Sequence, residues 1–89
     1  MKAIVTVVGK DRVGIIAMVS TLLSGKNVNI LDISQTILQE FFTMTMLVDL
    51  STGETPFDVL SAALSQKGQD MNLSIRIQRE DIFDAMHRI

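Results

Sequence analysis

Residues 7–23 read VVGKDRVGIIAMVSTLL, and this stretch changes character twice. A β-branched run ends at Gly9, three charged residues follow, and apolar side chains then recur at helical spacing. The spacing of Ile15, Val19 and Leu23 predicts a helix over residues 11–24. The stretch is therefore expected to form a buried strand, a tight charged loop and an amphipathic helix.

Outward from this stretch, the same two patterns alternate along the chain. Alternating apolar residues predict strands over residues 2–9, 28–39, 41–50 and 71–78. A second helix is expected between an N-cap at Thr55 and a stop at Gly68. Its predicted buried stripe is Phe57, Leu60, Ala63 and Leu64. The alternation breaks near Leu31–Asp32, which predicts a bulge, and Gln39–Glu40 must form a turn.

The order strand, helix, strand, strand, helix, strand predicts an α+β fold of the ferredoxin-like βαββαβ type. Right-handed crossovers would place both helices on one face of a four-stranded antiparallel sheet, with spatial strand order four, one, three, two. The other face of the sheet is expected to be mostly polar, with Thr6, Thr43, Thr45, Ser74 and Arg76. The last residues are expected to add a short C-terminal helix.

Composition narrows the classes of function. The chain has 89 residues, no cysteine and a net charge of −2. It has no stripe of basic residues, which argues against a nucleic-acid partner. No apolar run is long enough for a membrane span and no signal peptide is apparent, so a cytoplasmic location is expected. The single histidine, His87, has no partner for a catalytic triad or a metal site. We therefore expect a protein that is not an enzyme and holds no metal or cofactor.

The loop between the first strand and helix offers the best candidate binding site. Gly14 leaves backbone N–H groups uncovered at a helix start, a place that attracts carboxylates. Asp11 beside it could hold an ammonium group, so together they suit an α-amino acid. The alternative is a capped turn without a ligand, because Asp and Gly are common at helix starts.

Residues 7–35, together with FTMTMLVDL and LSIRIQ further on, resemble an ACT domain, a small-molecule-sensing module. The resemblance covers residues 1–80 and leaves residues 81–89 as the extra helix. It is nearest to the small stand-alone ACT proteins of bacteria and archaea. One departure is Val13, since the family commonly has proline before the second glycine of this loop.

The resemblance implies a ligand, often an amino acid, held between two subunits. One wall would be the loop, here Gly9, Lys10, Asp11, Arg12, Val13 and Gly14 with Ile15. The other wall would be the start of the second strand, with Asn29 and Ile30, contributed by the partner subunit. We add Asp32 from geometry. The expected ligand is a small amino acid such as glycine or serine, because few aromatic residues lie near the loop.

The second predicted strand also favours a homodimer. It has one charge, Asp32, between residues 28 and 39, whereas Arg76 and Arg79 protect the other edge of the sheet. Pairing of two such edges would join two sheets into one, and burial of the open sheet face is an alternative mode. These features favour a regulatory module that acts on a metabolic enzyme or other protein. The rival hypothesis is an interaction adaptor that binds no metabolite.

Overall fold

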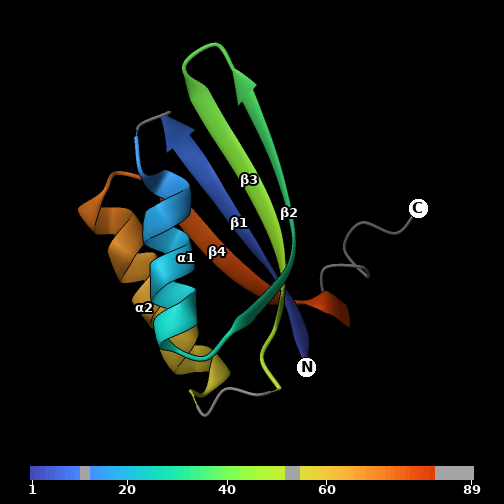
Figure 1. Cartoon of the computed structure of the whole chain (residues 1–89). Helices are drawn as coiled ribbons and strands as arrows, with labels where there is room; N and C mark the ends of the chain where they lie inside the picture. The colour runs from blue at the N-terminus through green and yellow to red at the C-terminus, as the bar shows by residue number, and fades with distance from the viewer. Residues whose placement is uncertain (11–12, 52–54, 82–89) are drawn as a thin grey trace.

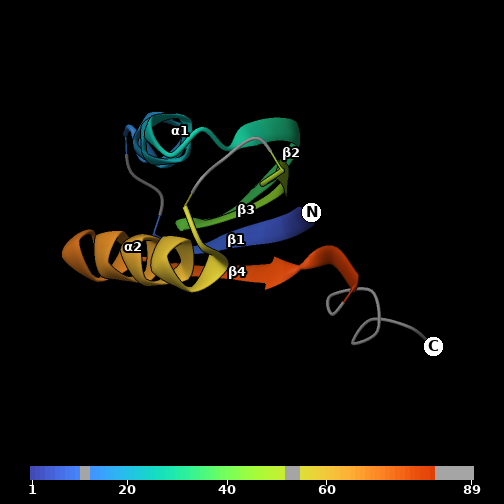
Figure 2. The same cartoon turned by 90° about the horizontal axis from the view of Figure 1, so that it is seen from below.

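The elements follow the predicted order in a computed structural model that describes residues 1–10, 13–51 and 55–81. They are β1 (Lys2–Lys10), α1 (Ile15–Gly25), β2 (Asn29–Leu38), β3 (Phe41–Asp49), α2 (Phe57–Asp70) and β4 (Ser74–Arg79). The strands form one antiparallel sheet in the order β2-β3-β1-β4, and both helices cover the same face (Figures 1 and 2). The split βαβ fold is confirmed. The predicted C-terminal helix lies outside the described residues.

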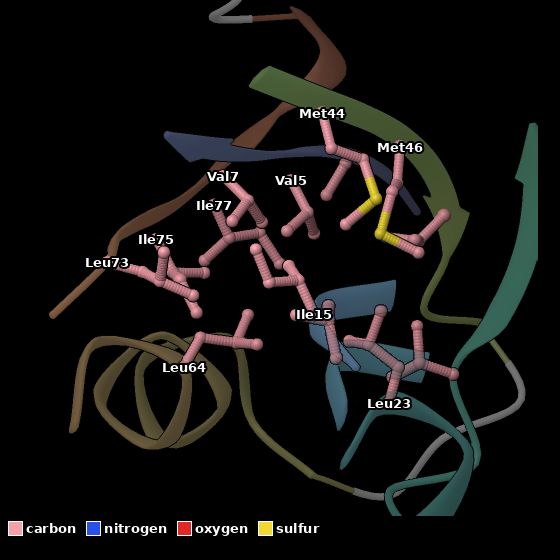
Figure 3. Packing of buried hydrophobic residues seen from close by; sticks show 14 of the residues in the cluster. Val5, Val7, Ile15, Leu23, Met44, Met46, Leu64, Leu73, Ile75 and Ile77 are labelled. Carbon is pink, nitrogen blue, oxygen red and sulfur yellow. The ribbon is translucent and has the colours of Figure 1, made fainter. Parts of the chain in front are cut away.

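The core lies between the sheet and the two helices. Alternate residues of the strands point into it, because successive side chains of a strand point to opposite faces. Figure 3 shows Val5, Val7, Met44 and Met46 from the central strands facing Ile15, Leu23 and Leu64 from the helices. On α2, Leu60 and Leu64 are buried as predicted, whereas Phe57 and Ala63 are only half-buried.

A bulge in β2 decides which of its side chains face the helices. The β2–β3 register shifts between Ile30 and Asp32, as the sequence predicts. Beyond the shift, Ile33, Gln35 and Ile37 lie opposite the buried residues of β3, so they share the helix-covered side. Asp32, Ser34, Thr36 and Leu38 therefore lie on the open side. The hairpin closes through Gln39, whose φ is 57°.

Both helices begin later than predicted. α1 starts at Ile15 rather than at residue 11. Gly14 has a φ of 89°, which is not a helical value, so the helix begins only after it. α2 starts at Phe57, and the extended Pro56 occupies the N-cap position that we predicted for Thr55. The N-cap residues Gly14 and Pro56 make no side-chain hydrogen bond to the helix amides. In the first turn of α2, the Val59 amide donates to the Asp58 carboxylate at 3.0 Å.

Gly68 does not end α2, contrary to the prediction. The helix runs on to Asp70, and the fourth strand begins at Ser74 rather than at Met71. A Cβ atom at position 68 would lie 2.6 Å from the carbonyl oxygen of Leu73, so only glycine allows α2 to approach the start of β4 this closely. The turn between them passes through Asn72, whose φ is 57°.

The open face of the sheet is less polar than predicted. The expected hydroxyl and guanidinium groups of Thr6, Thr43, Thr45, Ser74 and Arg76 are there, on the side opposite the core. The two central strands add Ile4, Val8 and Leu47 to the same face. The sequence pattern identified the inward phase of each strand correctly, and we overlooked these three apolar residues in its outward phase.

Candidate functional site

The start of α1 presents backbone amides that no side chain of the described residues caps. Gly14 occupies the N-cap position, and its carbonyl oxygen accepts a hydrogen bond from the Met18 amide at 2.9 Å. The first amides of any α-helix have no partner within the helix, and the helix dipole adds positive potential there. Val13, just before the cap, is fully exposed. This end of the helix can therefore receive an anionic group such as a carboxylate.

A groove adjoins these amides, and we call it the α1 groove. Its volume is about 510 Å³, and its lining residues are Gly14, Ile15, Ile16, Ala17, Gln35, Ile37 and Phe42. The walls are apolar apart from backbone and the carboxamide of Gln35. The hairpin end of β2 and β3 projects past the start of α1 (Figure 1). Its residues Gln35, Ile37 and Phe42 form one side of the groove. An anion site and apolar walls thus meet in one place.

Five groove residues escaped the sequence analysis: Ile16 and Ala17 of α1, and Gln35, Ile37 and Phe42 of the β2–β3 hairpin. A signal for Gln35 was present, because it is the one polar residue in the alternating series Ile33, Gln35, Ile37. A polar side chain on the core side of a strand is informative, since it must find water or a partner there. Gln35 is exposed at the rim of the core, where the groove provides that water.

The predicted site residues before Val13 are Gly9, Lys10, Asp11 and Arg12. Gly9 and Lys10 lie at the end of β1 opposite Phe42 and Phe41. A Cβ atom at Gly9 would collide with the side chain of Leu73, so packing explains this glycine without a ligand. Asp11 and Arg12 lie outside the described residues.

The predicted residues of β2 lie away from the α1 groove of their own subunit. Asn29 pairs with Asp49 beyond the far end of α1, and a helix of 11 residues is about 16 Å long. Ile30 is half-buried and packs against the core. Asp32 is on the open side, and its carboxylate accepts a hydrogen bond from the Ile33 amide at 2.9 Å. One chain therefore does not bring the predicted loop and strand residues together.

Asn29 instead lines a second, polar hollow of about 490 Å³ together with Ser24, Asn27, Val28 and Asp49. The Asp49 carboxylate accepts hydrogen bonds from the hydroxyl of Ser51 at 2.6 Å and from its amide at 2.9 Å. These bonds, aided by the terminal amino group and Lys2, lower the pKa of Asp49. The Met1 amino group lies 3.8 Å from the same carboxylate. The Asp49 oxygen is thus already engaged by the protein itself.

The chemistry available elsewhere is limited. Within residues 1–10, 13–51 and 55–81, no three His, Cys, Asp or Glu side chains are grouped as metal ligands, and no polar side chain is buried. In the same part of the chain, no helix is long and apolar enough to cross a membrane. His87 lies outside it. The α1 groove is the place where the described residues combine a charge preference with a defined shape.

Comparison with known proteins agrees with this architecture. The ACT-domain family model matches residues 2–78. A UPF0237 protein from Clostridium acetobutylicum is 56% identical over 89 residues and is matched over 100% of both chains. An ACT domain protein from Streptococcus pneumoniae has a TM-score of 0.83 at 47% identity, with 98% of each chain covered.

A formyltetrahydrofolate deformylase from Pseudomonas syringae has a TM-score of 0.79 at 25% identity, with 88% of this chain and 27% of that chain covered. The fold therefore also occurs as one part of a longer protein. The match to the family model spans most of the chain, from the first strand to the last. The chain belongs to the ACT-domain family.

Proposed function

We propose that this protein is a ligand-binding regulatory module that acts as a homodimer and takes an amino acid in the α1 groove. ACT domains are generally ligand-binding regulatory modules. The observation that carries the proposal is that the start of α1, where the N-cap Gly14 provides no capping side chain, opens into an apolar groove. The amides of Ile15 and Ile16 receive the carboxylate, and the groove walls receive the side chain.

A second subunit completes the site for the ammonium group. When two β2 edges pair antiparallel about a two-fold axis, the start of one strand lies beside the end of the other. The end of β2 adjoins the α1 groove, so the partner's Asn29 approaches that groove. Asn29 and Asp11 are the groups that we assign to the ammonium. Asp32 has no such role here, because it is on the open side of the sheet.

The groove also bears on the size of the ligand. From the sequence we expected glycine or serine, yet four of the lining side chains are large and apolar: Ile15, Ile16, Ile37 and Phe42. Apolar walls favour ligands that bury apolar surface, at roughly 0.8 kcal/mol per CH₂ group. We therefore rank small aliphatic amino acids above glycine and serine.

A thermal-shift screen of the twenty amino acids tests this proposal. A hydrophobic dye is needed, because the chain has no tryptophan or tyrosine. A ligand at a hundredfold excess over its dissociation constant adds about 2.7 kcal/mol, which raises the melting temperature of a domain this size by roughly 10–20 °C. Asn29→Ala and Asp11→Ala should abolish the shift, whereas Gln66→Ala on the exposed side of α2 should retain it.

One observation favours a second function, an adaptor that binds another protein and no metabolite. Leu38 and Phe41 beside the hairpin turn are 72% and 50% exposed, and Val13 is fully exposed. Exposed apolar clusters often mark protein contacts. If no amino acid at millimolar concentration shifts the melting temperature, the amino-acid proposal fails and the adaptor function is the better account.

A further inference from the structure

The outer edge of β2 contains an uninterrupted segment with a structural limit at each end. It runs from Asp32 to Leu38, between the register shift at Ile30/Asp32 and the turn at Gln39. β2 is the edge strand of the sheet, so one side of its backbone is not paired with another described strand. We call residues 32–38 the edge segment. A bulge interrupts a ladder and a turn ends it, so a strand added to this edge can pair over seven residues at most.

The two sides of the edge segment differ in chemistry. On the helix side lie Ile33, Gln35 and Ile37, and the two isoleucines are 40% and 54% exposed. On the open side lie Asp32, Ser34, Thr36 and Leu38. The helix side thus offers an apolar surface with one carboxamide at its centre. The open side offers two hydroxyl groups between the charge of Asp32 and the exposed apolar side chain of Leu38.

A symmetric partner can align with this segment in few ways. Residues directly opposite each other in an antiparallel pair point to the same side of the sheet. A two-fold axis perpendicular to the sheet keeps the helix side of one copy next to the helix side of the other. If the pairing shifted by one residue, each isoleucine would lie opposite a side chain that points to the other face. The two-fold axis must therefore pass between the two copies of one residue.

Only one axis position pairs isoleucine with isoleucine and hydroxyl with hydroxyl, and it leaves Asp32 opposite the partner's Leu38. With the axis at Ile33 or Ser34, the paired residues would extend into the bulge. With the axis at Thr36, they would extend into the hairpin turn. An axis at Gln35 places Ile33 opposite the partner's Ile37 and Ser34 opposite the partner's Thr36, each twice. β-branched apolar pairs and hydroxyl pairs both stabilise antiparallel ladders. No charge lies opposite a like charge in this register.

We propose that two copies of this chain pair through the edge segment with the two-fold axis at Gln35. This inference rests on the homodimer of the proposed function and adds its register. Gln35 meets the partner's Gln35 across the axis, and each carboxamide N–H can donate to the other's carbonyl oxygen. Gln35 and Ile37 also line the α1 groove, so the paired strands form a common wall between the two grooves. The glutamine pair therefore links the two proposed ligand sites.

Cysteine cross-linking tests this register, because the natural chain has no cysteine. Residues directly opposite in an antiparallel pair have Cα atoms about 4.5–5.5 Å apart, within the range that a disulfide spans. Gln35→Cys should therefore form a disulfide-linked dimer under mild oxidation. Ser34→Cys and Ile33→Cys are the matched controls, since their own copies lie about 8 Å or more away, beyond the reach of a disulfide.

The expected result is cross-linking of Gln35→Cys on the order of tenfold faster than of either single control, because disulfide formation is limited by Cα separation. The double variant Ile33→Cys/Ile37→Cys should cross-link as readily as Gln35→Cys. Faster cross-linking of Ser34→Cys or Ile33→Cys than of Gln35→Cys would overturn the register. Sedimentation separates the two levels of failure: a dimer without these cross-links removes this inference alone, and a monomer at micromolar concentration removes the proposed homodimer as well.

Discussion

Four of the described residues have a left-handed backbone conformation, and they lie where the chain changes direction. They are Gly14, Asn27, Gln39 and Asn72, with φ values between 57° and 89°. Glycine and asparagine adopt this conformation readily, whereas a residue such as glutamine does so at a cost. Gln39 is held there by the pairing of β2 with β3 on both sides of the turn. The strands thus determine this turn, and the turn residue itself does not.

Gly14 and Gly25 make a matched pair that isolates the effect of backbone conformation. An added Cβ atom would have no neighbour within 4 Å at either position, but only Gly14 has a positive φ. Gly14→Ala should lower the free energy of unfolding by about 1–2 kcal/mol. Gly25→Ala should raise it by about 0.4–1 kcal/mol, because alanine restricts the unfolded chain. Denaturant melts check both, and equal effects of the two substitutions would contradict this interpretation.

The binding residues show where sequence reasoning reached its limit at this scale. Gly14 and Ile15 were predicted and lie at the α1 groove. Gln35, Ile37 and Phe42 were not, because they come from β2 and β3, and their approach to α1 depends on how far the hairpin extends past the helix. A single sequence contains no local signal for that extension.

α2 and β4 approach each other closely, and Gly68 is the reason. The helix passes so close to the chain at Leu73 that Gly68 is buried between them. The Leu73 amide donates a hydrogen bond to the Gly68 carbonyl oxygen at 2.7 Å. A glycine inside a helix is unfavourable by itself, by about 1 kcal/mol relative to alanine. Contact with β4 outweighs that intrinsic cost here.

Gly68→Ala should therefore destabilise the protein, although alanine is the better helix former. The new methyl group would sit 2.6 Å from a backbone oxygen, and separating α2 from β4 should cost about 1–3 kcal/mol. Ser65→Ala, at an exposed position of the same helix, is the control and should be slightly stabilising. A stabilising effect of Gly68→Ala in urea melts would show that the two elements separate without cost.

Element ends were predicted less well than element interiors, and the physical reason is the same in each case. Periodic apolar residues fix where a helix or strand is buried, so Val19, Leu23, Leu60 and Leu64 were identified correctly. Ends depend on tertiary contacts. Gly68 reads as a stop signal in the sequence, and the proximity of Leu73 gives it a different role.

For the whole molecule, one core between sheet and helices carries the stability. Both helices pack on the same face of the sheet (Figure 2), so one core cluster combines side chains from elements that are distant in sequence. The order of strands and the choice of covered face followed from the sequence, because right-handed crossovers leave few alternatives. The dimer and its shared site do not follow from one chain, since they depend on a second copy.

Leu60→Ala tests this view of the core. Leu60 is fully buried, so its truncation should lower the free energy of unfolding by about 2–5 kcal/mol. Val59→Ala is the control on the same helix, because Val59 is 49% exposed and its truncation should change stability by less than about 0.5 kcal/mol. Guanidinium melts of both variants give the comparison. Similar losses for the two would contradict the burial of this side of α2.

The central position of β1 in the sheet has a consequence for folding during synthesis on the ribosome. β1 lies between β3 and β4, with Val5 opposite both Met46 and Ile77. Of the four strands, β1 is synthesised before the others, yet the strand that closes its second side is synthesised after them. The nascent chain must therefore carry an apolar strand with an open edge until Ile77 has emerged, and the sheet can be completed only then. Chaperones that shield short apolar strands would find their target in β1, before α1 and α2 have been made.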